Sequence, residues 1–500
     1  MKTRAPARLI TIAIMVCFAG TVLRAGPVRG VAENSTAGSP LVATDCKPET
    51  VVHPGFKRIY IALRNGRDGS GKSEVDARDG SSAEKFDRIL RCYAEGCSGP
   101  APGKSVAKTE NLIVCLGPGT FRTRGTYDFM VNLPHRTEEG FTLGKGWKIH
   151  GSGEDKTTVQ LNAYLPIRAV PNPQNLPVGS GAGVVFSTNS DDASGIEISD
   201  LTVDANYPAL KAQAAREGIR ALNLEAIHLR SDQGRNWIHD IKVVHAAGEV
   251  GNLNIRWEAF PILIYSVRAN STPRDSSGNV IERVKMSSYG GGECTAVAIA
   301  NAVAEVRQNK VEGYQIGYGG WILGPAWFHD NVAIGTEYGF NIDSLANQGV
   351  RIERNQIIHP RKYGIVIGGS GTYSGFLIAD NTVRIRQPGA IGLVFRGNVR
   401  DTVVQGNSFL WEGSSSLRQF LMGTTAIMNY SRDRSEANRN NLYQANRISE
   451  NLKIVFTGSS RREESCAAGN RDQNGRLLRD LPDNHGEGCA AAIRTGNAAQ

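Results

Sequence analysis

Short stretches of alternating apolar and polar residues recur along the chain from about residue 195. In five of them an apolar residue is followed by two further residues, an Asn, one more residue and a second apolar residue. They are VRQNKV, WFHDNVAI, IERNQII, IADNTVRI and VVQGNSFL, and they contain Asn309, Asn331, Asn355, Asn381 and Asn407. These Asn residues lie 22, 24, 26 and 26 positions apart, and a repeat of this length is typical of a solenoid.

A second pattern alternates with the first. It begins with a small residue and continues with alternating apolar positions, at Ile227, Ile262, Val297, Trp321, Phe340, Ile365, Leu393 and Ile427. Alternation with a period of two, bounded by Gly, Asn and Ser, predicts strands rather than helices, so each repeat contains at least two short strands. Because Asn tolerates left-handed backbone and its amide can bond to an Asn on the next coil, we expect a stacked Asn ladder at one corner.

Other repeat classes fit less well, because the leucine scaffold of leucine-rich repeats is missing and a β-propeller blade needs about 40 residues. The sequence resembles a right-handed parallel β-helix of the pectate-lyase-like superfamily over roughly residues 145–457. WKIHGSGEDKTTVQL (147–161) resembles the first coil of such proteins and IEISDLTVDAN (196–206) a later one. The resemblance implies an all-β fold, a right-handed parallel β-helix solenoid. The motifs of polygalacturonases, alginate epimerases and one pectate lyase family are absent from the sequence.

The segment before the repeats predicts one helix. Ser81-Ser82-Ala83-Glu84 matches a capping box, and Phe86, Ile89, Leu90 and Tyr93 follow at helical spacing, so we expect an amphipathic helix over 82–95. In similar proteins such a helix covers the open N-terminal end of the solenoid, which protects strand edges. We therefore divide the chain into residues 1–25 (export signal), 26–144 (N-terminal segment with the capping helix), 145–457 (β-helix) and 458–500 (irregular tail).

The first residues predict export. Lys2, Arg4 and Arg8 precede an apolar stretch over 9–23, and Ala25 and Gly26 follow, which is the order of a cleaved secretory signal. We expect a secreted or periplasmic protein with no membrane span after the signal. Cleavage removes four Lys and Arg and no acid, so the formal charge falls from +9 to +5. This balance suits an anionic glycan or a cell surface and gives no support for nucleic acid as a partner.

Seven Cys remain after the signal, so at least one thiol is free or bonds another chain. We expect disulfides between Cys92 and Cys97 and between Cys466 and Cys489, with Cys46 and Cys115 as a further candidate pair. The spacing of Cys and His gives no indication of a zinc site.

Strand alternation also predicts where a site lies. In the second pattern Ile227, Ile262, Phe340, Ile365 and Leu393 point inward, so the residues between them point outward. The outward positions are His228, Arg230, Tyr265, Asn341, Asp343 and Arg396. Loops that enter the same face add Trp257, Glu258, Tyr289, Glu293, Tyr314, Tyr318, Glu337, Tyr338, His359, Arg361 and Lys362. We expect these side chains to line a long groove.

Aromatic rings offer flat apolar surfaces to sugars, so a polysaccharide is the expected partner. Glu258 and Glu293 fall on neighbouring turns, Glu293 and Glu337 two turns apart, and Asp343 on the turn of Glu337, so hydrolysis by a pair of carboxylates is one possibility. Elimination is the other, and it requires a base and a cation. Lys362, Arg361, Arg230 and His228 are the candidates for these roles, with Ca²⁺ as the one candidate cofactor and its ligands unknown.

The leading hypothesis is therefore a secreted carbohydrate-active enzyme, a glycoside hydrolase or a polysaccharide lyase. A non-catalytic glycan-binding or adhesion solenoid is the alternative. His239-Asp240 and His329-Asp330 stand where strands begin, so we interpret both pairs as corner residues on another face of the solenoid. Proteins of this architecture also form trimers, so a homotrimer is one expectation, although no coiled-coil heptad is present.

Overall fold

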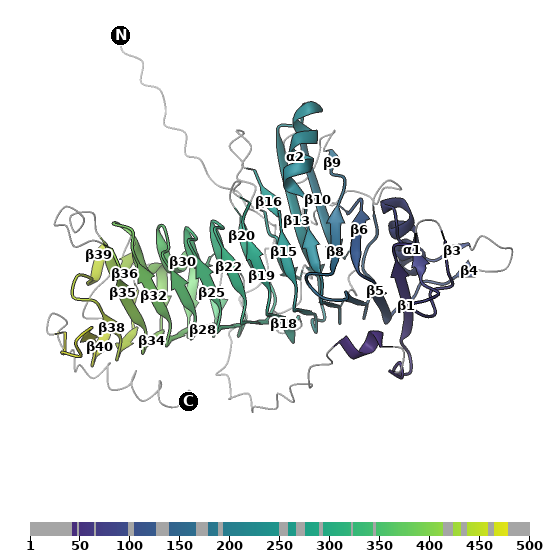
Figure 1. Cartoon of the computed structure of the whole chain (residues 1–500). Helices are drawn as coiled ribbons and strands as arrows, with labels where there is room; N and C mark the ends of the chain where they lie inside the picture. Colours follow the sequence, from purple (N-terminus) through teal and green to yellow (C-terminus); the bar gives the residue numbers. More distant parts are fainter. Residues whose placement is uncertain are drawn as a thin grey trace, which may run out of the picture.

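The structure is a computed structural model. It describes residues 43–47, 50–64, 67–98, 105–126, 140–166, 179–188, 194–249, 259–266, 276–289, 294–321, 324–343, 347–413, 424–431, 438–458 and 465–478. Within these ranges three long sheets wind around one axis as a parallel β-helix, which confirms the predicted fold. The solenoid runs from the purple N-terminal end at the right of Figure 1 to the yellow C-terminal end at the left.

Sheet 1 has 14 strands and forms the first side of each coil. In spatial order they are β2 (Arg78–Asp79), β1 (Lys57–Ala62), β5 (Leu112–Leu116), β7 (Lys148–His150), β11 (Glu197–Ser199), β14 (Trp237–His239), β18 (Asn279–Glu282), β21 (Ala304–Arg307), β24 (Trp327–His329), β28 (Arg351–Glu353), β31 (Leu377–Ala379), β34 (Val403–Gln405), β37 (Leu442–Gln444) and β40 (Cys466–Ala468).

Sheet 2 follows sheet 1 in each coil and has 12 strands. They are β6 (Gly119–Thr123), β8 (Thr157–Leu161), β12 (Thr202–Asp204), β15 (Lys242–Val244), β19 (Lys285–Ser287), β22 (Lys310–Glu312), β25 (Val332–Ile334), β29 (Gln356–Ile358), β32 (Thr382–Ile385), β35 (Ser408–Trp411), β38 (Arg447–Ile448) and β41 (Arg471–Asp472). β1 and β5 lie before residues 145–457, the range expected for the β-helix, and still belong to sheet 1. The sheets therefore extend beyond the expected range.

Sheet 3 closes each coil and has 13 strands. They are β9 (Leu165–Pro166), β10 (Ser180–Ser187), β13 (Ala221–Arg230), β17 (Ile262–Tyr265), β20 (Thr295–Ala300), β23 (Ile316–Trp321), β26 (Tyr338–Ile342), β30 (Tyr363–Ser374), β33 (Ile391–Arg400), β36 (Thr425–Ser431) and β39 (Ile454–Gly458), with β16 (Ala247–Gly248) beside β13 and β27 (Asn347–Gln348) beside β30. A separate antiparallel pair joins β3 (Cys97–Ser98) and β4 (Ser105–Val106).

The interior confirms the predicted alternation in sheet 3. Ile227, Ile262, Phe340, Ile365 and Leu393 are all 0% exposed. The predicted register is wrong in one coil only. Val297 pairs with Tyr318, and Tyr318 pairs with Phe340, so Tyr318 occupies the inward position that the pattern assigns to Trp321. The ring of Tyr318 stacks on that of Phe340 at 4.9 Å inside the solenoid.

The predicted Asn ladder is present at the corner between sheets 1 and 2. The side-chain amide of Asn309 donates to Asn331, Asn331 to Asn355, and Asn355 to Asn381, over 2.9 to 3.0 Å. The same contact continues through Asn407, Asn446 and Asn470. These buried amides satisfy backbone groups at a corner where no sheet hydrogen bond can form.

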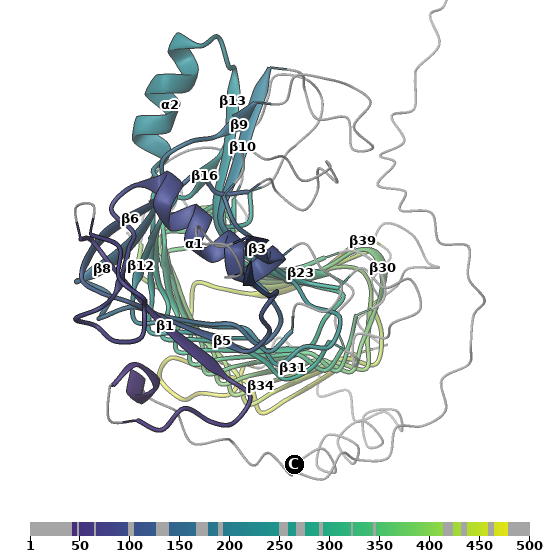
Figure 2. The same ribbon diagram turned by 90° about the vertical axis from the view of Figure 1, so that its right-hand side faces the viewer.

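In the described ranges, two α-helices lie outside the coils. α1 (Ala83–Glu95) is close to the predicted range and packs Phe86 against Phe121 and Phe141. Its N-cap is Ser82, whose hydroxyl accepts from the backbone N–H of Lys85, so the cap lies one residue after the expected Ser81. The third helical residue is then Lys85 instead of Glu84, and the expected capping box does not form. α1 lies at the N-terminal end of the solenoid (Figure 2), and its role as a cap stays a prediction.

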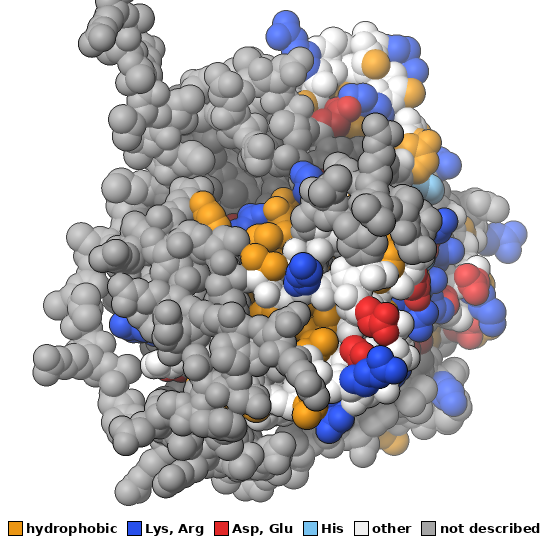
Figure 3. Space-filling view, turned by 90° about the vertical axis from the view of Figure 1, so that its left-hand side faces the viewer, with side chains coloured by type: hydrophobic (Ala, Val, Ile, Leu, Met, Phe, Trp, Pro, Cys, Tyr) orange, Lys and Arg blue, Asp and Glu red, His pale blue; other side chains and the backbone are white. Residues whose placement is uncertain are grey.

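α2 (Tyr207–Arg216) follows sheet 2 and projects from the solenoid together with β9, β10, β13 and β16 (Figure 2). At the C-terminal end of the molecule, hydrophobic side chains are visible beside charged groups (Figure 3). No helix in the described ranges is long and apolar enough to cross a membrane.

Two of the expected disulfides join described residues, Cys46 to Cys115 and Cys92 to Cys97. The first ties the short helix η1 (Ala43–Cys46) to β5. Cys466 is also disulfide-bonded, and Cys489, its expected partner, lies outside the described residues, as does the export signal. Cys294 is a buried thiol outside these disulfides, and its sulfur accepts from the backbone N–H of Gly248 over 3.1 Å.

Candidate functional site

The best candidate surface lies at the corner where the chain passes from sheet 2 to sheet 3. Three successive coils bring several predicted residues together there. We call this surface the corner strip. It consists of Glu337, Tyr338, Arg361, Lys362 and Tyr363 at the corner and of Arg396, which lies within β33 and reaches the ring of Tyr363. Glu337 and Tyr338 lie at the start of β26, and Lys362 and Tyr363 occupy the same positions at the start of β30. Adjacent coils are about 4.8 Å apart, so equivalent side chains become neighbours along the axis.

The aromatic part of the corner strip is the pair Tyr338 and Tyr363. Their ring centroids are 5.3 Å apart, and the rings are tilted by 45°. Both side chains are half-buried, so each ring keeps an accessible part. The guanidinium of Arg396, one coil further on, lies 4.5 Å from the centroid of Tyr363. This contact fixes a cation on the aromatic surface.

The charged part of the corner strip borders the rings. Lys362 forms an ion pair with Glu337, and the side chain of Lys362 is 58% exposed. The hydrogen bond that Lys362 donates to Glu337 raises the pKa of Lys362, so the ammonium stays charged. Arg361 is exposed and donates to the backbone oxygen of Tyr314, two coils away, over 3.4 Å. The strip therefore presents three cations and one carboxylate beside two Tyr rings.

Two other predicted residues lie on the outer face of sheet 3. Asn341 is half-buried, and Asp343 is exposed directly after β26. Glu337 and Asp343 flank this strand, so their Cα atoms are separated by six extended residues, or about 20 Å. That separation is too long for a pair of glycosidase carboxylates.

The predicted residues on β13 and β17 point outward but are covered. His228 is 0% exposed, and its Nε2 lies 2.9 Å from the buried carboxylate of Glu225 and 2.8 Å from the backbone oxygen of Phe260. Tyr265 is 5% exposed, and Arg230 is half-buried. The outward orientation from strand alternation is confirmed, but the expected accessibility of His228 and Tyr265 is not.

Four more predicted residues are described but do not belong to the corner strip. Tyr314 and Tyr318 are 1% and 0% exposed, so the prediction that they line a surface is wrong. The hydroxyl of Tyr318 donates to the backbone oxygen of Asn309 over 2.9 Å inside the solenoid. His359 bonds to Glu412 at 2.8 Å, and Tyr289 is 53% exposed beside α2. Trp257, Glu258 and Glu293 lie outside the described residues.

The His-Asp pairs lie on the outer face of sheet 1, as expected for corner residues. His239 stacks on Trp237 at 3.7 Å, and its ring nitrogens face Asp240 at 2.8 Å and Glu197 at 3.4 Å. Arg283, from the next coil, donates two hydrogen bonds of 2.7 Å to Asp240. Burial alone lowers the pKa of His239, but the hydrogen bonds to Asp240 and Glu197 raise it above its ordinary value.

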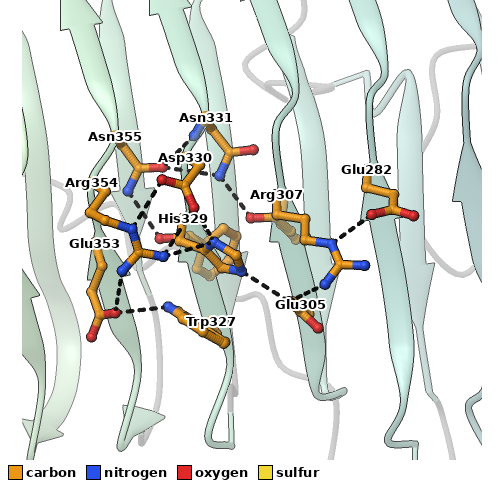
Figure 4. A network of polar contacts seen from close by, with 12 residues as sticks. Glu282, Glu305, Arg307, Trp327, His329, Asp330, Asn331, Glu353, Arg354 and Asn355 are labelled. Carbon is orange, nitrogen blue, oxygen red and sulfur yellow. Dashed lines mark hydrogen bonds and ion pairs between the residues drawn. The ribbon is translucent and has the colours of Figure 1, made fainter. Parts of the chain in front are cut away.

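The same arrangement occurs a second time, three coils further on (Figure 4). His329 stacks on Trp327 at 3.9 Å and faces Asp330 at 2.6 Å and Glu305 at 2.9 Å. Arg354 again binds the Asp through two hydrogen bonds, both of 3.0 Å. The repeated WIHD and WFHD segments of the sequence thus build two matching ionic clusters.

Arg307 links the two clusters, because it donates to Glu282 over 2.6 Å and to Glu305 over 2.7 Å. The indole N–H of each Trp is also bonded, Trp237 to Glu282 and Trp327 to Glu353. The charged groups of these clusters face one another, so their arrangement favours a stabilising role. In the described ranges, no group of three or more His, Cys, Asp and Glu is arranged to hold a metal ion.

Sequence reasoning missed two members of the site region. Tyr363 was overlooked although it occupies the position of Tyr338 on the next coil. His245 was overlooked because it precedes an irregular stretch, and only the coil lengths place it next to Tyr289, with ring centroids 5.5 Å apart.

No protein-family model and no curated protein matches the sequence. Several solved structures match the chain at low identity and low TM-score. The A-module of mannuronan C-5 epimerase AlgE6 from Azotobacter vinelandii is 13% identical with a TM-score of 0.44, over 72% of this chain and 90% of that one. DFA-IIIase from Arthrobacter chlorophenolicus A6 without its lid is 12% identical with a TM-score of 0.46, over 84% and 97%. PfbA, a surface adhesin of Streptococcus pneumoniae, is 12% identical with a TM-score of 0.37, over 78% and 86%. The fold assignment rests on the three parallel sheets themselves.

Proposed function

We propose that the protein is an exported carbohydrate-active β-helix that binds a polysaccharide along the corner strip and cleaves it. The observation that carries this proposal is the pair of partly accessible rings, Tyr338 and Tyr363, with Arg396 on the second ring. Flat rings that follow one another along the solenoid axis suit successive sugar units of an extended chain.

The charges of the strip favour an anionic polysaccharide. The strip has three cations, Arg361, Lys362 and Arg396, and one carboxylate, Glu337. Lys362 already forms an ion pair with that carboxylate. Uronic acid carboxylates accept charge-assisted hydrogen bonds from such cations. Elimination next to a uronate carboxylate needs a neutralising cation and a base, and the strip offers the cations.

A non-catalytic glycan-binding solenoid is the second candidate. It is favoured by the charges of the strip, because its one carboxylate, Glu337, is paired with Lys362 and none of the other five strip residues is an acid. Both functions use the same surface, and only turnover distinguishes them.

The test is to incubate the purified protein with neutral and uronic acid polysaccharides, with Ca²⁺ and with chelator. Unsaturated uronate is followed by its ultraviolet absorbance, and reducing ends are counted in parallel. We expect both to rise with an anionic substrate. Reducing ends without absorbance would mean hydrolysis instead, and binding without either product would support the second candidate.

Binding is assigned to the strip by variants. We expect Tyr338→Ala with Tyr363→Ala to weaken glycan binding at least tenfold, because both stacking surfaces are lost. Lys310→Ala serves as the control. It removes a side chain that is 55% exposed, about as much as that of Lys362, but lies outside the strip on the outer face of sheet 2. Unchanged binding by the double variant would overturn the assignment of the strip.

A further inference from the structure

Asp204, His245 and Tyr289 form a second polar cluster on the same corner, towards the N-terminal end. They come from three successive coils. Asp204 ends β12, His245 follows β15 directly, and Tyr289 follows β19 by two residues. The coil of Tyr289 lies two coils from that of Tyr338, or about 10 Å along the axis. An extended chain on the corner strip therefore reaches this cluster without changing direction.

The carboxylate of Asp204 is fixed and orients the imidazole of His245. Its Oδ1 lies 2.8 Å from Nδ1 of His245 and accepts from the backbone N–H of Asn206 over 2.8 Å. Its Oδ2 accepts from the side-chain amide of Gln160 over 2.8 Å. Because a carboxylate only accepts, Nδ1 carries a proton, and Nε2 is the nitrogen that can bind or release one.

The cluster is accessible from solvent. The side chain of His245 is 41% exposed, whereas that of Asp204 is 9% exposed. Tyr289 is 53% exposed and meets the edge of His245 at a ring angle of 81°. Behind Tyr289 lies the buried ring of Tyr207, 6.3 Å away, at the start of α2. The arrangement is an oriented imidazole next to an open aromatic surface.

The backbone of His245 is unusual for a His. Its φ is 54°, in the left-handed region, and at the matching corner two later coils use Gly313 and Gly335. A non-Gly residue in this conformation costs about 1–2 kcal/mol, so the turn itself does not call for a His. In the described coils, His359 is the one other His with a left-handed backbone at this corner. Its φ is 53°, and its side chain is 37% exposed.

We propose that Asp204 and His245 form the proton-transfer dyad of this protein, with Tyr289 as the platform for the reacting sugar. The inference rests on the proposed function and adds the reacting group to it. His245 is the catalytic residue, and Asp204 is a positioning residue that holds the tautomer.

The step is an elimination. Nε2 of His245 removes the proton on the carbon next to the uronate carboxylate. The electron pair of that C–H bond forms the new carbon–carbon double bond, and the neighbouring C–O bond breaks. The leaving oxygen keeps the bonding pair and takes a proton from water.

The test compares His245→Asn with His359→Asn on the full-length mature protein. Asn tolerates left-handed backbone, so both variants keep the turn. His359 is a matched control, with the same φ, similar exposure and its own carboxylate, Glu412. We expect His245→Asn to lower kcat by 10²-fold or more with KM nearly unchanged, and His359→Asn to keep wild-type kcat.

Asp204→Asn and Tyr289→Ala test the other two roles. We expect Asp204→Asn to lower kcat and to shift the pH dependence of kcat, since the tautomer of His245 is no longer fixed. Tyr289→Ala should raise KM more than it lowers kcat. Turnover within threefold of wild type in His245→Asn would overturn the dyad and leave the proposed function standing. A wild-type protein without turnover on any glycan would overturn the dyad together with the proposed enzyme.

Discussion

At the scale of single residues, the Asn ladder contributes stability through buried amides that have no alternative partners. Asn355 is 1% exposed. Its amide donates to Asn381 and to the backbone oxygen of Phe328, both over 2.9 Å, and its oxygen accepts from Asn331 over 3.0 Å. Asn355→Ala removes the buried side-chain partner of the Phe328 oxygen and of one N–H of Asn331, so we expect the free energy of unfolding to fall by about 3 kcal/mol in urea titrations.

Asn162→Ala is the control for this prediction. Asn162 is exposed, and its backbone N–H, which the variant keeps, donates to the backbone oxygen of Thr123 over 2.9 Å. This variant should unfold within about 0.5 kcal/mol of the wild type. An equal loss in both variants would mean that the ladder adds nothing beyond an ordinary surface Asn.

Tyr318 shows at the same scale how one residue is misplaced by a sequence pattern. The segment GYGGWIL contains a small residue before Tyr318 and another before Trp321, so the alternation rule accepts two registers. The structure selects the one that stacks Tyr318 on Phe340 and turns Trp321 outward, towards Phe260 at 5.4 Å. Alternation alone contains no information on such packing between coils.

Tyr318→Phe distinguishes the buried position from a surface role. The variant keeps the ring and loses the hydroxyl that donates to Asn309 and lies 3.2 Å from the backbone oxygen of Val332. We expect the free energy of unfolding to fall by about 1–2 kcal/mol and the affinity for glycans to remain unchanged in titration calorimetry. A loss of affinity with full stability would return Tyr318 to the binding surface.

At the scale of elements, the two clusters on sheet 1 predict a pH dependence. Burial raises the pKa of both Asp240 and Glu197. Hydrogen bonds from Arg283 and His239 outweigh this effect for Asp240, and contacts with His239 and Lys148 outweigh it for Glu197. Both pKa values therefore lie below their ordinary values. The stability from these carboxylates is present above about pH 4 and is lost as the pH falls through their lowered pKa values. His239 has the opposite sign, because its pKa is raised. Its contribution is present below about pH 6.5 and is lost as the pH rises through the raised pKa.

Stability should therefore be highest between about pH 4 and pH 6.5 and should decline on both sides. Urea unfolding at closely spaced pH values measures this profile. His239→Gln should flatten the alkaline decline, and His53→Gln, which changes an exposed His outside the clusters, should not. An alkaline decline of the same slope in His239→Gln would show that its imidazole is not the responsible group.

The clusters also show which contacts between elements can be predicted from the sequence. The Asn spacing and the alternating strands are local patterns, so the coils and the ladder were predictable from them. The contact of His239 with Glu197 spans 42 residues and that of His329 with Glu305 spans 24. Such contacts depend on the length of each coil, and the sequence alone leaves these lengths open wherever loops vary.

At the scale of the whole molecule, the same limit applies to the site. The solenoid and its inward residues followed from the repeat. The corner strip instead needs the register of three coils, and the neighbours Asp204 and His245 are 41 residues apart. A groove on the face of sheet 3 was expected because outward residues were treated alike. His228 and Tyr265 are covered there, whereas Arg361 and Lys362 at the corner are exposed.

The position of the strip along the axis predicts how affinity depends on the length of a glycan. His245 belongs to the coil of β15, and Arg396 belongs to the coil that contains β32 and β33, five coils further on. At about 4.8 Å per coil, the two residues are separated by about 24 Å along the axis. Oligosaccharides of increasing length should therefore bind progressively more tightly until they span about 24 Å, and longer chains should gain little. Titration calorimetry with a size series measures this. An affinity that reaches its maximum with a single sugar would place recognition in one small pocket, and the strip would then have no role as an extended binding surface.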